Sequence, residues 1–159
     1  VVRLVGSEMC IRDSIKNVSN EHDELILNKE IHNIFLPIPC NFRFNYINKA
    51  CLERKNVLCE KPVCNDLNEM KQISNMVKKH DIMFIDATDF LYNPKLVNFK
   101  KEICDFNNVY FKFYLEKDSS FIKTNIRTDK NLEPLGCLGD IGWYAIRWAL
   151  FLFLSLIHI

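Results

Sequence analysis

Glycine is scarce in this sequence. The 159 residues include four glycines, at positions 6, 136, 139 and 142, and no Gly-x-Gly-x-x-Gly segment. A dinucleotide-binding domain normally opens with such a segment, because the backbone must approach the pyrophosphate closely at a helix N-terminus. If this protein uses a dinucleotide, we expect the segment that binds the pyrophosphate to lie upstream of this sequence.

Blocks of like charge and long apolar runs are missing too. The formal net charge is +1, which gives no electrostatic reason to expect nucleic acid or an anionic membrane surface as a partner. The apolar stretch at 148–157 is about half as long as a membrane-spanning helix, and Arg147 and His158 bound it. We therefore expect no nucleic-acid partner and no membrane anchor.

The cysteines and histidines lack the spacing of metal ligands. Seven cysteines form no Cys-x-x-Cys pair, and the four histidines lie apart from one another. Cys59 and Cys64 flank Lys61 and Pro62, so a zinc site there is the alternative. We favour reduced thiols, several of them buried as small hydrophobic side chains, in a cytoplasmic protein without a metal site.

Strand and helix patterns alternate over the first half of the chain. Apolar runs at 31–36, 56–59 and 82–85 are typical of strands, and helical spacing separates them at 42–54 and 66–79. With no hairpin turns between them, right-handed crossovers and a parallel sheet covered on both faces are expected. The fold class predicted is α/β, the second half of a doubly wound, Rossmann-like sheet.

The two predicted helices each carry an apolar face. Asp66 and Glu69 have the spacing of a capping box and predict the start of the second helix. The residues expected to be buried are Phe44, Ile47, Ala50 and Cys51 on the first helix, and Leu67, Met70, Ile73 and Val77 on the second.

The pattern changes after Asp89. Asn93 and Pro94 interrupt the chain, a short helix follows to about residue 103, and apolar and polar residues then alternate over 109–115. Such alternation is typical of an antiparallel strand with one solvated face. We therefore place a domain boundary near residue 91, with a partial dinucleotide-binding domain at 15–91 and the start of an α+β antiparallel-sheet domain at 92–152.

The first stretch that indicates chemistry is 56–62. A strand ends there in Glu60, Lys61 and Pro62, and ligands of open α/β sheets bind at the carboxyl ends of the strands. A lone lysine at a strand end is usually solvated surface, so this stretch alone is weak support for a site.

The second stretch is 136–147. Asp140 is expected to cap a helix that continues to about residue 152, with Tyr144 one turn after it. The glycines at three-residue spacing resemble a phosphate cradle, but no strand precedes them and no Lys or Ser follows in P-loop register. We favour glycines that let the helix start pack closely against another part of the backbone.

These two stretches, together with 85–94 and 121–127, resemble the glucose-fructose oxidoreductase/inositol dehydrogenase (Gfo/Idh/MocA) family over about residues 21–150. The similarity is to the branch of dimeric dihydrodiol dehydrogenases and D-xylose dehydrogenases. It implies an NAD(P)-dependent oxidoreductase that transfers a hydride between nicotinamide and a secondary alcohol of a small molecule, a sugar or a trans-dihydrodiol. It also implies a homodimer for the full-length protein.

The resemblance assigns roles to residues of this chain. Tyr144 is expected to be the general acid/base, and Asp140 to orient a substrate hydroxyl. Lys61 is expected to lower the cost of forming tyrosinate or to polarise the substrate oxygen. Glu60 is expected to fix the turn, and the Lys61–Pro62 bond to be cis.

The resemblance also implies a set of cofactor-binding residues. They are Glu60, Lys61, Pro62, Pro39, Asn41 and Arg127. For Arg127 a surface ion pair is the alternative. Many relatives carry a histidine a few residues after the proline that corresponds to Pro39, whereas this chain has Arg43 near that place. NAD and NADP both remain open, because the residue that reads the ribose 2′ position belongs to the upstream half of the domain.

The two ends of the chain look foreign. Residues 5–14 and 154–159 resemble a sequencing-library adapter translated in frame, so 1–14 and 153–159 are interpreted as artefacts at the ends of a fragment. Two alternatives to an active dehydrogenase follow. One is an inactive fragment, and the other is a non-catalytic relative that senses dinucleotide.

Overall fold

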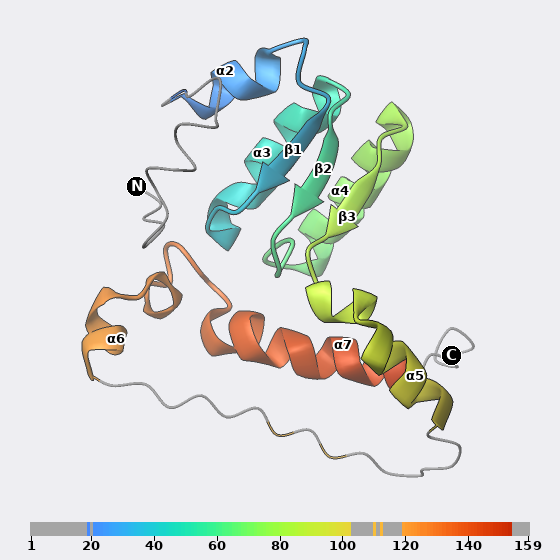
Figure 1. The fold of residues 1–159 in the computed structure, drawn as a ribbon. Coiled ribbons are helices and arrows are strands. Elements are labelled where there is room, and N and C mark those ends of the chain that lie inside the picture. The colour runs from blue at the N-terminus through green and yellow to red at the C-terminus, as the bar shows by residue number, and fades with distance from the viewer. Residues whose placement is uncertain (1–18, 20, 103–109, 111, 113–118, 154–159) are drawn as a thin grey trace, which may run out of the picture.

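A three-stranded parallel sheet forms the centre of the molecule (Figure 1). The computed structural model describes residues 19, 21–102, 110, 112 and 119–153. The strands are β1 (Asn33–Leu36), β2 (Asn56–Cys59) and β3 (Phe84–Asp86), in the order β1-β2-β3. Val57 pairs with Ile34 on one side and with Phe84 on the other. The predicted parallel α/β sheet is confirmed.

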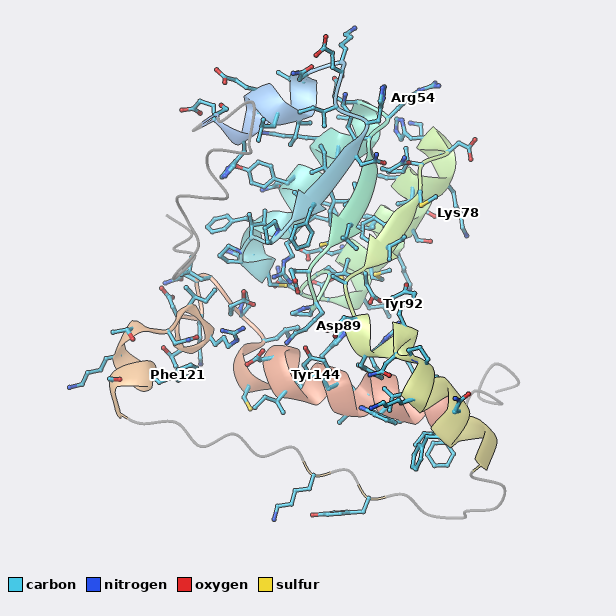
Figure 2. The ribbon with its side chains drawn as sticks, viewed as in Figure 1. Arg54, Lys78, Asp89, Tyr92, Phe121 and Tyr144 are labelled. Carbon is cyan, nitrogen blue, oxygen red and sulfur yellow. The ribbon has the colours of Figure 1, made fainter. Side chains whose placement is uncertain are left out.

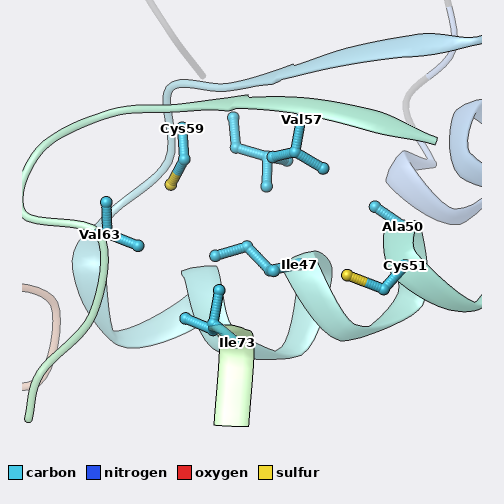
Figure 3. Packing of buried hydrophobic residues seen from close by; sticks show 8 residues of the cluster. Ile47, Ala50, Cys51, Val57, Cys59, Val63 and Ile73 are labelled. Carbon is cyan, nitrogen blue, oxygen red and sulfur yellow. The ribbon is translucent and has the colours of Figure 1, made fainter. Parts of the chain in front are cut away.

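Two helices connect the strands and lie together on one face of the sheet (Figure 1). They are α3 (Cys40–Leu52) and α4 (Leu67–His80). Figure 3 shows Ile47 and Ile73 of these helices meeting Val57 and Cys59 of β2. These side chains are almost fully buried. The core therefore lies between β2 and the two helices, as the helical spacing of the sequence predicts.

The opposite face of the sheet is open within the described part of the chain. Phe35, Leu58 and Ile85 lie side by side in register on this face, and their exposed fractions are 50%, 41% and 38%. The sequence predicted cover on both faces, because strands joined by crossovers without hairpin turns form parallel sheets of that kind. In the structure α3 and α4 cover only the face that carries Val57 and Cys59.

Helix α4 begins at the predicted capping box. Asp66 accepts a hydrogen bond from the backbone N–H of Glu69 at 2.8 Å, and such a cap contributes about 1 kcal/mol. The predicted apolar stripe is only partly buried, since Ile73 is 1% exposed but Leu67 is 69% exposed. Leu67 lies in the first turn of α4, beyond the surface that α3 and β2 cover.

The second half of the described chain is helical. After a 3-10 turn (Asp89–Tyr92) come α5 (Pro94–Glu102) and α6 (Ser119–Thr124), and then a second 3-10 turn (Ile126–Thr128). A π-helical turn (Leu138–Gly142) leads directly into α7 (Trp143–Leu152). Figure 1 shows α7 beside α5, close to the carboxyl ends of the strands. The structure describes only residues 110 and 112 of the strand predicted at 109–115, so this prediction is not tested; the adapter-like residues 1–14 and 154–159 lie outside the described residues.

The chain also has a short helix before the sheet, α2 (His22–Leu27). It is joined to α3 by an ion pair between Asp23 and Lys49, with a distance of 2.7 Å between Oδ1 and Nζ. Among the residues that the structure describes, no helix is both long and apolar enough to cross a bilayer.

Candidate active site

A cavity of about 240 Å³ opens at the carboxyl ends of β1 and β2. This is the edge of a parallel sheet at which α/β proteins bind ligands. The residues that line the cavity are Pro37, Ile38, Arg43, Glu60, Lys61, Pro62, Ile126, Arg127, Glu133 and Asp140. Five predicted site residues, Glu60, Lys61, Pro62, Arg127 and Asp140, are thus brought together at one cavity.

Asp140 is the centre of a charged cluster on the cavity wall. Its Oδ1 lies 2.7 Å from Lys61 Nζ, and its Oδ2 lies 2.8 Å from Arg127 Nε. Lys61 Nζ also donates to the Asp140 backbone carbonyl at 2.7 Å. The Lys61 side chain is 10% exposed and that of Asp140 is 20% exposed, so solvent screens their ion pair less than it screens a surface pair. Arg127 thus forms an ion pair, which was the alternative predicted for it, and its partner is Asp140.

The sheet places Lys61 at this cavity. Strand β2 ends at Cys59, and the backbone N–H of Glu60 still bonds to the Leu36 carbonyl of β1 at 3.3 Å. The Lys61–Pro62 peptide bond is cis, as the resemblance implied. Lys61 is the second residue after the end of β2, and its side chain crosses to the turn that holds Asp140.

Asp140 does not cap α7, contrary to the prediction. It lies inside the π-helical turn, and the residue at the N-cap of α7 is Gly142, with no side-chain cap. Burial alone would raise the pKa of Asp140, but the hydrogen bonds and charges of Lys61 and Arg127 outweigh burial and lower this pKa below 3.8. Asp140 is therefore a carboxylate at neutral pH.

Gly139 provides the close approach that the glycine spacing predicted. A Cβ atom at Gly139 would lie 2.8 Å from Leu135 Cβ and 3.1 Å from Pro62 Cγ. Both distances are shorter than ordinary contacts, so a larger residue at 139 would push the π-helical turn away from Pro62. Glycine at this position thus keeps Asp140 within reach of Lys61.

Tyr144 lies next to the cluster, one turn after Asp140 on α7. Lys61 Nζ is 4.6 Å from the centre of the Tyr144 ring, in a cation–π contact. Burial raises the pKa of Tyr144, and the carboxylates of Asp89, Asp140 and Glu60 raise it further, whereas Arg127 opposes them. Figure 2 shows Tyr144 and Asp89 near each other at the end of the sheet. These surroundings favour the neutral phenol in this chain.

Two contacts that the sequence did not reveal anchor α7 to the end of β3. Trp143 Nε1 donates to Thr88 Oγ1 at 3.0 Å, and Thr88 is 1% exposed. Arg147 Nη2 lies 3.3 Å from Asp86 Oδ2. A threonine just after a strand and a tryptophan at a helix start are each unremarkable in the sequence, so only their meeting in space shows their role. They hold the helix that carries Tyr144.

Pro39 and Asn41 do not line the cavity. Pro39 is the N-cap residue of α3, and Asn41 Nδ2 donates to the backbone carbonyl of Asn131 at 2.9 Å. Arg43 does line it and is buried, and Glu133 lies beside it with 4.0 Å between Nη2 and Oε1. Sequence reasoning missed Glu133, whose acidic side chain lies in a polar loop. The described residues contain no group of three His, Cys, Asp or Glu able to hold a metal ion.

Comparison with known proteins identifies the family. The family model for oxidoreductases of the Gfo/Idh/MocA type, described by its NAD-binding Rossmann fold, matches residues 6–87, more than half of the chain. An uncharacterized oxidoreductase of Schizosaccharomyces pombe is 25% identical over 158 residues, covering 95% of this chain and 42% of that protein. Levoglucosan dehydrogenase of Pseudarthrobacter phenanthrenivorans is 23% identical over 156 residues, covering 93% of this chain and 40% of the enzyme.

Solved structures share the fold. The 3-ketoreductase KijD10 of Actinomadura kijaniata, in complex with NADP and TDP-benzene, superposes with a TM-score of 0.51 at 18% identity, covering 52% of this chain and 26% of that one. An NAD-binding protein of Listeria innocua superposes with a TM-score of 0.53 at 16% identity, covering 59% and 27%. The chain spans about two fifths of the length of the two curated relatives. It belongs to the Gfo/Idh/MocA family of oxidoreductases with an NAD-binding Rossmann fold.

Proposed function

We propose that this chain is part of an NAD(P)-dependent dehydrogenase or reductase that interconverts a secondary alcohol and a ketone on a small molecule, a sugar or a trans-dihydrodiol. The observation that carries the proposal is the meeting of Lys61, Asp140 and Arg127 at one cavity, at the carboxyl ends of β1 and β2. The Lys61–Asp140 pair of this cluster is largely shielded from solvent, with side chains 10% and 20% exposed, and such a pair stabilises developing charge far better than a surface pair does.

The residues of the cavity fit the nicotinamide end of the cofactor. Ile38 and Ile126 supply apolar walls for a flat ring, and Lys61 and Arg127 supply hydrogen-bond donors beside them. Apolar walls with a few convergent polar groups are typical of cofactor sites. When bound, the cofactor supplies the carbon that donates or accepts the hydride. Glu60, Lys61, Pro62 and Arg127 would hold it, and both NAD and NADP remain open.

The protein's task is then to place the substrate oxygen and to move its proton. Lys61, fixed by Asp140, donates a hydrogen bond to that oxygen and favours the negative charge that develops there as a ketone is reduced. Tyr144 carries its phenolic proton at neutral pH, and its raised pKa keeps it protonated further into the alkaline range, so it is able to donate the proton to the oxygen. In alcohol oxidation the proton moves the other way: Tyr144 first loses its phenolic proton to solvent, and as tyrosinate it accepts the proton of the substrate hydroxyl.

Pro39 and Asn41 contribute to the cofactor site indirectly in this proposal, because neither lines the cavity. They lie at the start of α3, where Asn41 bonds to the 131–132 loop. The five cysteines that the structure describes are all free, which supports a reducing, cytoplasmic compartment. A homodimer of the full-length protein is part of the proposal.

A dinucleotide sensor without activity is the second candidate, and the fixed Lys61–Asp140 pair favours catalysis over it.

The test is made on the full-length protein, with sugars, trans-dihydrodiols and the corresponding ketones as substrates. Hydride transfer is followed by the nicotinamide absorbance, and cofactor affinity by fluorescence. We expect Tyr144→Phe to lower kcat by about 10²–10⁴-fold, because that is the usual contribution of a general acid, while the cofactor Kd stays unchanged. Lys61→Ala should lower kcat comparably.

Matched controls exist for both substitutions. Tyr92→Phe changes a tyrosine that is 69% exposed, and Lys49→Ala removes a lysine whose side chain is 47% exposed. Neither control should alter kcat. Full activity of both Tyr144→Phe and Lys61→Ala would contradict the proposed roles, and cofactor binding without any turnover of these substrate classes would favour the sensor.

A further inference from the structure

Arg43 is a buried cation outside the set of predicted catalytic residues. It is 5% exposed. Burial of a guanidinium costs several kcal/mol unless hydrogen bonds and an opposite charge compensate it. The partners of Arg43 therefore indicate what its position in the fold achieves.

Those partners come from three segments that meet at the cavity. Arg43 Nε donates to the Ile38 carbonyl at 2.7 Å, in the loop after β1. Its Nη1 donates to the carbonyl of Pro62, directly after Lys61. Its Nη2 faces Glu133 at 4.0 Å, and Glu133 also accepts the backbone N–H of Cys40 at 3.1 Å. Arg43 thus joins both strand-end loops to the 131–135 loop.

Lys61 is consequently held from two directions. Asp140 holds its ammonium group, and Arg43 holds the main chain that carries it, through the Pro62 carbonyl. A single hydrogen bond donor at position 43 would reach only one of the two loops, whereas the guanidinium fork presents several N–H groups in fixed directions.

We propose that Arg43 is a positioning residue for Lys61, which sets the place of the Lys61–Pro62 turn relative to the loop after β1. The proposal rests on the proposed function for its consequence in catalysis. A misplacement of about 1 Å in an active site is able to cost on the order of 100-fold in rate, so a loose turn would leave the cofactor site present but poorly aligned.

The test measures Lys61 itself and needs no enzyme activity. The chain is pulsed with acetic anhydride, and acetylation of each lysine is followed by mass spectrometry. Lys55 is the internal control for the rest of the fold, because it is 4% exposed and its Nζ bonds to the Asn28 carbonyl. Lys49 lies at the surface, so its acetylation rate shows that the reagent is equally active in each experiment.

In Arg43→Met we expect the acetylation rate of Lys61 to rise several-fold while that of Lys55 stays as in the parent chain. The double variant Arg43→Met/Glu133→Gln gives the same result without an unpaired buried carboxylate, which guards against a folding defect. Arg54→Met removes an exposed arginine and should change neither rate.

An unchanged Lys61 rate in both Arg43 variants would overturn the proposal. A parallel rise at Lys61 and Lys55 would overturn it as well, because Arg43 would then support the whole fold rather than the turn. The turnover of Lys61→Ala in the full-length protein is a separate result, so a failure of the proposed function remains distinguishable from a failure of this inference.

Discussion

The hydrogen bond between Trp143 and Thr88 is expected to stabilise the packing of α7 against the end of β3. Thr88 follows β3 and is 1% exposed, and Trp143 is the first residue of α7. The distance of 3.0 Å between Nε1 and Oγ1 is that of a well-formed bond. Its removal should therefore loosen α7, which carries Tyr144.

The magnitude follows from the burial of the two groups. Thr88→Val keeps the shape of the side chain but leaves the indole N–H without this acceptor, which costs roughly 1–3 kcal/mol. Trp143→Phe removes the donor and part of the ring, so we expect a somewhat larger loss of unfolding free energy. In the double variant no unpaired group remains, and the coupling between the two sites should be about 1 kcal/mol.

The assay is urea unfolding of the four proteins in this double-mutant cycle. Thr124→Val is the matched control, because Thr124 is exposed and bonds within α6, and its effect should stay within about 0.5 kcal/mol. Strictly additive effects of Thr88→Val and Trp143→Phe would refute the reasoning, since two residues that share a buried hydrogen bond must couple.

Two further predictions concern ionisation. The pKa of Asp140 is lowered in the folded chain, so its stabilising contribution is present above pH 3.8 and is lost as the pH falls through the folded value. Asp140→Asn should therefore reduce the loss of unfolding free energy between neutral and acid pH. The same pH dependence in Asp140→Asn and in the parent chain would contradict the assignment. Burial raises the pKa of Cys40 and of Cys59 to about 12, so iodoacetamide at mildly alkaline pH should alkylate the exposed Cys137 far faster, and rapid alkylation of either buried thiol would count against this packing.

The strands and the first two large helices were predictable because their signals are local. The run at 56–59 matches β2 residue for residue, and the predicted cap at Asp66 is present. Ile47, Ala50 and Cys51 are buried as the helical spacing predicts. Apolar runs of this length and a capping box depend mainly on neighbouring residues, so they are visible without knowledge of the tertiary fold.

Burial was less predictable, because it depends on what packs against an element. Leu67 has the spacing of a core residue, yet it is 69% exposed. Phe35, Leu58 and Ile85 are apolar strand residues on the sheet face that no described helix covers. A hydrophobic period identifies the face of an element that is suited to burial, but only the neighbouring elements determine whether that face is buried.

The site shows the same limit more sharply. By local rules an acidic residue before a helix is a good N-cap, which is the role predicted for Asp140. In the structure the side chain of Asp140 instead bonds to Lys61, 79 positions away in the sequence. Two charged donors at 2.7 and 2.8 Å form charge-assisted hydrogen bonds, which are stronger than a bond from a neutral backbone N–H. The Asp140 carboxylate therefore bonds to Lys61 and Arg127 and does not cap α7. Asp140 was thus nominated by its motif, whereas its partners Lys61 and Arg127 depend on how the end of the sheet packs against the π-helical turn.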